Sequence, residues 1–357
     1  MESYLTNLCM GFFESDVAVV APARQGWEAV DQKLPYRVFR LRGSYQRGSR
    51  RVYREILEAA HEFQPDVIHF LAALPLGRLG SRLRQATGLP YTVVAHGTGE
   101  ILLPSRVPFA KRALRRVLTD ADRVFPVSEF TEKAVKEITD GEAKTVVVQP
   151  CVDVNRFSLD VSGAAVRQRH ALGGSFVVLF VSRLVKRKGA DVLIRALGEN
   201  GSAVAVIAGT GSDRASLERL SREVGVADRV VFAGFVPDDE LPAYYAAADC
   251  FCMPCTTRMG GLDTEGFGVV YLEAQASGLP CIAGRCGGSG EAVVHGETGV
   301  VLDNPTPSSV RRAIDLFAGD PALTARVGAA GRLRIEQEFA PEVAAGRIEE
   351  ALEGVIG

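Results

Sequence analysis

The sequence of 357 residues has little net charge, no long apolar run and no regular framework of cysteines. A net charge of −2 argues against a protein that coats nucleic acid, because neutralising phosphates needs a marked excess of basic residues. No apolar run approaches the roughly 20 residues that a membrane-spanning helix requires. Residues 1–8 lack the basic and apolar regions of a signal peptide. We therefore expect a cytoplasmic protein with no nucleic-acid partner, and with any membrane contact being peripheral.

Cysteine spacing and repeats narrow the choice of fold further. The seven cysteines are scattered, which suits a reducing compartment better than a disulfide scaffold. Short internal repeats and low-complexity tracts are absent, which excludes solenoids. Because 47% of the residues are apolar and the chain is longer than one core can use, we expect two globular domains.

Short apolar, β-branched runs alternate with longer helical stretches along the chain, a pattern typical of parallel sheets. In the first part of the chain these predicted strands are residues 17–21, 67–70, 91–95, 123–127 and 145–149. In the second part they are residues 176–181, 203–208, 229–233, 250–253, 280–283 and 299–302. The pattern predicts an α/β protein with two Rossmann-like, doubly wound domains that face a cleft.

Residues 150–171 lack a strong period and begin with a proline after a predicted strand, so they form the predicted linker. We place the N-terminal domain at 1–153, the C-terminal domain at 154–335, and a helix that returns to the first domain at 336–357. Residues 1–150 contain 21 Lys and Arg against 17 Asp and Glu, whereas the remainder contains 20 against 26. The first domain is therefore the basic one.

Two carboxylates, Glu265 and Glu273, lie eight positions apart at the predicted start of a helix. The amides of Gly266, Phe267 and Gly268 would be unpaired at such a helix N-terminus, and the glycines would let an anion approach. Glu265 would then face a sugar, and Glu273 could accept hydrogen bonds from ribose hydroxyls. The alternative is a pair of solvated helix carboxylates.

Arg183 and Lys188 lie in the loop that follows the predicted strand at 176–181. A guanidinium offers a bidentate fork and an ammonium a point charge, which are the two common ways to hold phosphate oxygens. Between them, Lys186 and Arg187 are expected to be solvated. The alternative for the whole segment is an ordinary basic surface loop.

The Arg183–Lys188 loop followed by Glu265 and Glu273 resembles the retaining, two-domain (GT-B) nucleotide-sugar glycosyltransferases over nearly the whole chain. Residues 256–268 and the segment from His96 to Glu100 are most similar to actinobacterial mannosyltransferases that use GDP-mannose to build phosphatidylinositol mannosides. The resemblance implies transfer of mannose to such a lipid at the inner membrane face, with retention of configuration. A transferase with a soluble sugar or polyol acceptor, and a sugar-nucleotide epimerase on the same architecture, remain as alternatives.

The resemblance also implies roles for individual residues. Arg183 and Lys188 would neutralise the diphosphate leaving group, so that no metal cofactor is required. Glu265 would bind hydroxyls of the donor sugar, and His96 would approach that sugar from the first domain. The other implied donor contacts are Gly209, Gly211, Val236, Gly266, Phe267, Gly268 and Glu273.

Residues 106–116 predict a basic amphipathic helix, on which Arg112, Arg115 and Arg116 could contact anionic lipid. The alternative is the solvated face of an ordinary surface helix. Cys250, Cys252 and Cys255, together with Cys281 and Cys286, could supply zinc ligands, but the alternation within 250–253 fits buried strand cysteines better.

In the family that the chain resembles, a first strand and a glycine-rich loop precede the helix to which residues 2–8 correspond. Neither feature occurs in the sequence. We therefore expect a chain that is incomplete at its N-terminus and a first domain that lacks its first strand. The alternative is a divergent member of the family that closes the gap in another way.

Overall fold

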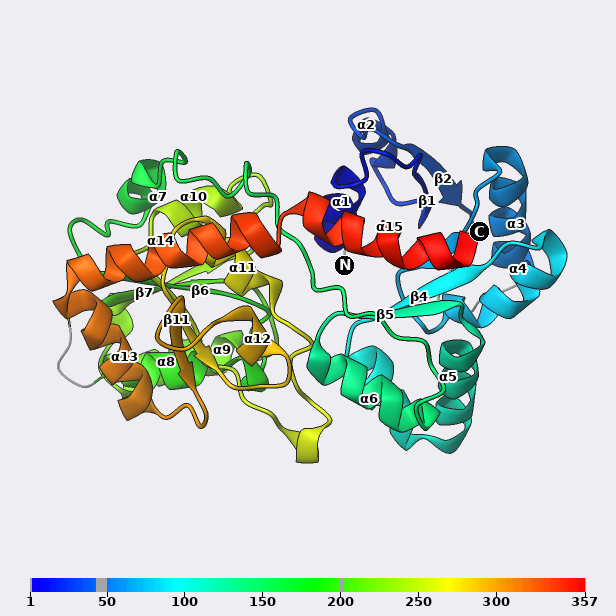
Figure 1. Cartoon of the computed structure of the whole chain (residues 1–357). Helices are drawn as coiled ribbons and strands as arrows, with labels where there is room; N and C mark the ends of the chain where they lie inside the picture. Colours follow the sequence, from blue (N-terminus) through cyan, green and yellow to red (C-terminus); the bar gives the residue numbers. More distant parts are fainter. Residues whose placement is uncertain (1, 43–49, 199–201, 357) are drawn as a thin grey trace. The chain divides into compact units, whose positions relative to one another are not determined.

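The computed structural model describes residues 2–42, 50–198 and 202–356, which divide into two compact units (Figure 1). Unit 1 comprises Met1–Cys151 and Pro341–Gly357, and unit 2 comprises Val152–Ala340. From the sequence alone, the first domain is expected to end at residue 153 and the second at residue 335.

Unit 1 has five strands, within the described residues, that form two parallel sheets. In the first sheet β1 pairs with β2, and in the second β4 lies between β3 and β5. β1 and β3 are not paired with each other in this part of the chain, so the two sheets are separate. The strands are β1 (Ala18–Pro22), β2 (Arg37–Leu41), β3 (Ile68–Phe70), β4 (Tyr91–Ala95) and β5 (Arg123–Pro126).

The longer helices of unit 1, such as α3, bury one face. On α3 the buried residues recur at helical spacing, from Val52 and Tyr53 through Ile56 to Ala59 and Ala60, which gives the helix one apolar face. The helices are α1 (Glu2–Met10), α2 (Trp27–Asp31), α3 (Arg50–Phe63), α4 (Gly80–Thr87), α5 (Pro108–Asp120), α6 (Glu129–Thr139) and α15 (Pro341–Ile356).

The C-terminal helix α15 belongs to unit 1 and packs against the N-terminal helix α1. Figure 1 shows the two helices side by side. A Cβ atom at Gly11 would lie 2.1 Å from the carbonyl oxygen of Pro341, so the close approach of these segments requires glycine.

Unit 2 is built on a six-stranded parallel sheet with the order β11-β10-β9-β6-β7-β8. The chain enters at β6, adds β7 and β8 on one side, and then crosses to add β9, β10 and β11 on the other. This order is that of a doubly wound Rossmann sheet. The strands are β6 (Val177–Val181), β7 (Val204–Ala208), β8 (Val230–Gly234), β9 (Cys250–Met253), β10 (Cys281–Gly284) and β11 (Gly299–Leu302).

Helices cover both faces of this sheet, as the crossover connections of parallel strands require. Figure 1 shows α8, α9 and α13 on one face and α7, α10, α11 and α14 on the other. Their bounds, with that of the short α12, are α7 (Ala164–Arg169), α8 (Ala190–Leu197), α9 (Arg214–Glu223), α10 (Leu241–Ala246), α11 (Val269–Ala276), α12 (Ser289–Ala292), α13 (Pro307–Gly319) and α14 (Pro321–Glu338).

Three local predictions are wrong. Residues 145–149 run beside β5 but are not a regular strand: they form one isolated bridge, between Thr145 and Val124, and the amides of Val146 and Val148 donate to the carbonyls of Val124 and Pro126. The strand β2 was not expected, because Arg37 and Arg40 interrupt its apolar pattern. The predicted linker at 150–171 contains α7, whose single buried residue, Val166, gives too weak a period to reveal a helix.

Candidate functional site

The strand order of unit 2 places the loop that carries Arg183 and Lys188 next to the loop that carries Glu265. β6 and β9 are adjacent and parallel, but the chain continues from β6 to β7 on one side of this pair and from β9 to β10 on the other side. The loops that follow them, 182–189 and 254–268, therefore diverge at the carboxyl edge of the sheet. Ligands of open α/β sheets bind in the crevice at such a switch point.

The loop after β6 presents one exposed and one buried cation. Arg183 is exposed, and its guanidinium has no ion pair or side-chain hydrogen bond with another described residue. Lys188 is buried, with 7% of its surface exposed. Gly189 follows it with a φ of 78°, and a Cβ there would lie 2.2 Å from the carbonyl oxygen of Pro254. The glycine thus holds the loop after β6 against the loop after β9.

Glu265, in the loop after β9, is the centre of a buried ion-pair cluster. The Lys188 Nζ lies 2.6 Å and the Arg187 Nη1 2.5 Å from the Oε2 of Glu265. The Arg187 Nε lies 2.9 Å from the Oδ1 of Asp263. The side chains of Arg187, Lys188 and Glu265 are 11%, 9% and 13% exposed, so bulk solvent screens these pairs little.

The charge of Glu265 follows from two opposing effects. Burial raises the pKa of its carboxyl, whereas the nearby charges of Lys188 and Arg187, and the hydrogen bonds that they donate, lower it. The net result is a pKa below the ordinary value. Glu265 is therefore a carboxylate at neutral pH, with two cations on the same oxygen.

The expectation that Arg187 is solvated is wrong. Lys186 is exposed, as expected, but the guanidinium of Arg187 is buried and bonded to two carboxylates. Three consecutive basic residues in a loop give no sequence signal for which one points inward. The carboxylate spacing of Asp263 and Glu265, two residues apart, is the one pattern that could have indicated a guanidinium partner.

Helix α11 begins directly after the Glu265 segment. Gly268 caps it with a φ of 95°, and a Cβ there would lie 2.7 Å from the Tyr271 ring. The amides of Phe267 and Gly268 donate no hydrogen bond to the described part of the chain. The Phe267 side chain is 3% exposed and packs on Phe339, with ring centroids 5.8 Å apart. Phe267 can therefore offer a ligand its amide but not its ring.

Glu273 lies on α11, and its carboxylate accepts a hydrogen bond from a tyrosine. The Tyr245 hydroxyl donates a hydrogen bond of 2.7 Å to the Oε2 of Glu273. Burial raises the pKa of Glu273, although this hydrogen bond and the charge of Arg156 act in the opposite direction. The hydrogen bond fixes one carboxylate oxygen and leaves the other as an acceptor for a ligand.

The glycines after β7 are required by the protein itself. Gly209 has a φ of 137°, and a Cβ there would lie 1.9 Å from the carbonyl oxygen of Ser182. A Cβ at Gly211 would lie 2.3 Å from the carbonyl oxygen of Leu184. Both glycines thus let the loop after β7 pack on the loop that carries Arg183.

Val236 follows β8 at the same edge of the sheet and is half-buried, beside Phe235, which is 74% exposed. His96 belongs to unit 1, where it follows β4. Its Nε2 donates a 2.8 Å hydrogen bond to the carbonyl of Leu71, and its ring contacts Tyr4 edge to face. Because a carbonyl only accepts, the Nε2 carries the proton and the Nδ1 is the accepting nitrogen.

Comparisons with known proteins decide the family. The family model for Glycosyltransferase Family 4 matches residues 1–156, and that for Glycosyl transferases group 1 matches residues 164–334. A GDP-mannose-dependent alpha-(1-6)-phosphatidylinositol monomannoside mannosyltransferase of Mycolicibacterium smegmatis is 39% identical over 326 residues, which cover 89% of this chain and 85% of the relative. The chain belongs to the GT-B glycosyltransferases.

Other relatives of this glycosyltransferase differ in their named reactions. A D-inositol 3-phosphate glycosyltransferase of Streptomyces avermitilis is 33% identical over 236 residues, 62% of this chain and 49% of the relative. The crystal structure of Anabaena Alr3699/HepE in complex with UDP has a TM-score of 0.81 at 22% identity, and the match covers 98% of this chain and 95% of that one. The structural likeness shows the two-domain fold.

The basic helix of the glycosyltransferase, α5, differs from its expected arrangement. Arg115 forms ion pairs with the exposed carboxylates of Asp140 and Glu142. Arg112 is exposed, and 80% of the Arg116 side chain is exposed. The expected lipid contact by Arg115 therefore has a competing partner within unit 1.

The N-terminal end of α5 exposes an apolar surface. Phe109 is 89% exposed, whereas Leu114, Val117 and Leu118 are the residues that α5 buries. The preceding residues Leu103 and Val107 are 42% and 54% exposed. Among the described helices of the glycosyltransferase, none is both long and apolar enough to span a membrane.

The five cysteines weighed as zinc ligands are all buried and free. Within residues 2–42, 50–198 and 202–356, no group of three His, Cys, Asp or Glu side chains is arranged to hold a metal ion. Cys250, Cys252 and Cys281 lie on the adjacent strands β9 and β10, within the core of the sheet.

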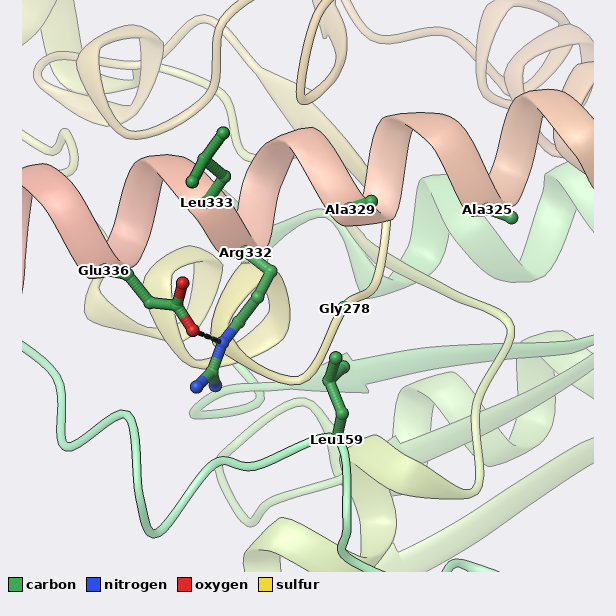
Figure 2. A pocket seen from close by; sticks show the side chains of 7 residues that line it. All are labelled: Leu159, Gly278, Ala325, Ala329, Arg332, Leu333 and Glu336. Carbon is green, nitrogen blue, oxygen red and sulfur yellow. Dashed lines mark hydrogen bonds and ion pairs between the residues drawn. The ribbon is translucent and has the colours of Figure 1, made fainter.

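A cavity of about 370 Å³ on unit 2 lies apart from the loops described above (Figure 2). Its one basic residue, Arg332, is paired with Glu336 and also donates to the carbonyl oxygens of Val154, Phe157 and Ala276. No cation in this cavity is left to bind a diphosphate. The lining residues are Leu159, Gly278, Ala325, Ala329, Arg332, Leu333 and Glu336.

Proposed function

We propose that this glycosyltransferase moves mannose from GDP-mannose to a phosphatidylinositol mannoside-type lipid with retention of configuration. One observation carries the proposal: Lys188 and Glu265 meet in a buried ion pair at the switch point of the unit 2 sheet, with Arg183 exposed on the same loop. The mannosyl donor and the lipid acceptor come from the name of the 39% identical relative.

In this proposal Arg183 and Lys188 bind the donor diphosphate. Breaking the bond between the sugar C1 and the phosphate oxygen leaves negative charge on the diphosphate, and two cations fixed beside it stabilise that charge. The free amides at the start of α11, at Phe267 and Gly268, add a positive dipole end to the same region. Because the protein supplies this charge itself, we propose that no metal cofactor takes part.

Glu265 accepts hydrogen bonds from hydroxyls of the donor sugar and does not act as a nucleophile. Its engagement by two cations lowers its basicity, which suits hydrogen bonding better than covalent attack on C1. The acceptor hydroxyl attacks C1 from the face that the diphosphate leaves, and its proton passes to the departing phosphate oxygen. His96, whose pKa burial lowers, is neutral at pH 7 and accepts a sugar hydroxyl through its Nδ1.

The backbone loops complete the donor contacts in this proposal. Gly266 lies in the segment between the carboxylate and the helix N-terminus, and the loop with Gly209 and Gly211 reaches the diphosphate. Val236 meets the base through its backbone. These loops end strands of one sheet at one edge, where a nucleotide binds in Rossmann-like domains.

Glu273 is proposed to bind the ribose hydroxyls. Glu273→Gln keeps the shape and the bond from Tyr245 but replaces one acceptor with a donor. The KM for the donor should rise about tenfold, with kcat changed less than about twofold, because the ribose contact is similar in ground and transition states. Initial rates measured across donor concentrations test this, with the exposed Glu297→Gln as the control. A loss confined to kcat would contradict the ribose role.

We propose that the tip of α5 contacts anionic lipid. The apolar side chain of Phe109 would enter the headgroup region, while nearby cations meet lipid phosphates. The exposed basic residues of this tip are Arg106, Lys111, Arg112 and Arg116.

Sedimentation with vesicles of phosphatidylcholine and phosphatidylinositol tests this surface. Arg112→Glu should lower binding about fivefold or more, since one basic residue near the surface contributes about 1 kcal/mol. Phe109→Ser should lower binding by a similar factor, because it removes the apolar side chain that enters the headgroup region. Arg115→Ala should have little effect, because Asp140 and Glu142 already engage that charge. Equal binding to vesicles of phosphatidylcholine alone would contradict an electrostatic lipid contact.

The reaction itself is tested with labelled donors and acceptors. We expect transfer from GDP-mannose to a phosphatidylinositol mannoside, and less from UDP-glucose. D-inositol 3-phosphate is the competing acceptor, because a 33% identical relative is named for it. Transfer to that acceptor alone would favour the soluble-acceptor alternative, and donor isomerisation without an acceptor would favour an epimerase.

A further inference from the structure

Glu265 has one more cationic partner than the proposed donor chemistry uses. Its Oε2 contacts both the Lys188 Nζ and the Arg187 Nη1. If Lys188 serves the diphosphate, its single ammonium is shared or withdrawn from the carboxylate once the donor binds. Arg187 is then the cation that stays with Glu265.

Three contacts hold Arg187 in place, which suits a cation that stays beside Glu265 when the donor binds. Its Nη1 contacts Glu265 and its Nε contacts Asp263, so one guanidinium bridges two carboxylates. Its backbone carbonyl accepts a 2.8 Å hydrogen bond from the amide of Thr256. The residue therefore ties the loop after β6 to the loop after β9 through both its side chain and its backbone. A planar fork held by two carboxylates keeps one orientation, unlike a flexible ammonium.

Asp263 has a fixed position of its own. The Arg258 amide donates to the Asp263 carbonyl at 2.8 Å, and the Asp263 amide donates back to the Arg258 carbonyl at 3.1 Å. These two bonds close a short loop whose tip contains Gly260 and Gly261, both with positive φ. Asp263 thus stands at the base of a closed turn and can hold the far side of the Arg187 guanidinium.

The charges around Glu265 show why such a partner is needed. Without ligand, Arg187 and Lys188 face the carboxylates of Glu265 and Asp263. A bound diphosphate adds negative charge beside a buried carboxylate, which favours protonation of that carboxylate. A protonated Glu265 would present an O–H donor in place of one of its acceptor sites for sugar hydroxyls.

We propose that Arg187 is a positioning residue that keeps Glu265 ionised and oriented toward the donor sugar after Lys188 engages the diphosphate, with Asp263 holding the Arg187 guanidinium. The inference rests on the proposed function.

The experiment compares Arg187→Ala, Arg187→Lys and Asp263→Asn with Lys186→Ala, which removes an exposed charge from the same loop. GDP, which lacks the sugar, is the binding probe, and calorimetry measures its Kd. For Arg187→Ala we expect a GDP Kd within about threefold of the wild-type value and a fall in kcat of at least about tenfold. Arg187→Lys should recover part of this loss because it keeps the charge, and Asp263→Asn should show a smaller loss.

The pH profile of kcat separates positioning from a merely structural role. Loss of a cation beside Glu265 raises the pKa of its carboxyl, so the acid limb of Arg187→Ala should move to higher pH. The other titratable groups around Glu265 are Lys188, Asp263, Cys255, Cys286 and Tyr271.

Cys286 needs its own control, because hydrogen bonds from Cys255, Thr264 and Thr257 bring the pKa of its thiol to about 6, although burial opposes them. The Cys286→Ser background should keep the shift of the acid limb that Arg187→Ala causes. A shift that disappears in this background would assign the titration to the thiol and overturn the inference.

Two further results would overturn it. One is an Arg187→Ala enzyme with the kcat and pH profile of Lys186→Ala. The other is a loss that lies in the GDP Kd alone, which would place Arg187 on the diphosphate. If Arg187→Ala fails to fold, as judged by its thermal unfolding midpoint, Arg187→Lys and Asp263→Asn decide by the same criteria. A wild-type enzyme that transfers from no nucleotide sugar would instead refute the proposed function.

Discussion

Lys188→Ala should lower the rate of glycosyl transfer about 100-fold and weaken GDP binding in parallel. The ammonium is buried beside Glu265, where bulk solvent screens it little. A charge-assisted contact in such a site contributes about 1.5–3 kcal/mol, and more in the transition state if charge develops on the leaving group. Arg183→Ala should also slow transfer, but less, because Arg183 is exposed to solvent screening.

Kinetics and GDP calorimetry on the two variants measure both effects. Lys186→Ala is the matched control, since it removes an exposed lysine two residues away and should leave rate and affinity within about twofold. The loss of Lys188 leaves Glu265 with Arg187 as its partner, so the fold should be retained. Wild-type kinetics for both Lys188→Ala and Arg183→Ala would refute the diphosphate role of this loop.

Gly209→Ala should destabilise unit 2 by about 3 kcal/mol or more. Its φ of 137° is a conformation that side-chain-bearing residues rarely adopt, and the added Cβ would lie 1.9 Å from the carbonyl oxygen of Ser182. Backbone strain of this kind costs about 1–3 kcal/mol, and the clash adds to it. Relief of the clash would separate the loops after β6 and β7, so donor binding should fall as well.

Gly225→Ala separates the strain from the clash. Gly225 has a φ of 72° at the end of α9, and a Cβ there would meet nothing within 4 Å. Its replacement should cost about 1 kcal/mol, as expected for a left-handed conformation without contacts. Urea unfolding of both variants gives the two free energies. Equal losses for the two would show that the contact with Ser182 has no energetic effect.

The alternation of apolar runs and helices was enough to predict the strands of unit 2. The four central strands, β6, β7, β9 and β10, are buried on both faces, so their residues form continuous apolar runs, as 177–181 does. Residues 37–41 escaped prediction because they lie in a two-stranded sheet where arginines are tolerated. Residues 145–149 have the composition of a strand and hydrogen-bond to β5, yet they form only an isolated bridge and not a regular strand.

The candidate site, like the fold, has features that the sequence predicted and features that it did not. The sequence predicted Lys188 and Glu265 as members of one site, but not that they pair with each other. The role of Arg187 could not be predicted, because which of three adjacent cations is buried depends on where Asp263 lies after folding. For the same reason the sequence placed Arg115 on a lipid surface, whereas Asp140 and Glu142 engage it in unit 1.

The sequence by itself determined the α/β class, the carboxyl-end loops that carry Arg183, Lys188 and Glu265, and the family resemblance. These depend on local composition and spacing, which the chain carries before it folds. Only the tertiary structure decided that Arg187 bridges Glu265 and Asp263, and that Gly209 packs on Ser182. Both depend on strand order, because β6 becomes the neighbour of β7 and of β9 only when the sheet has formed.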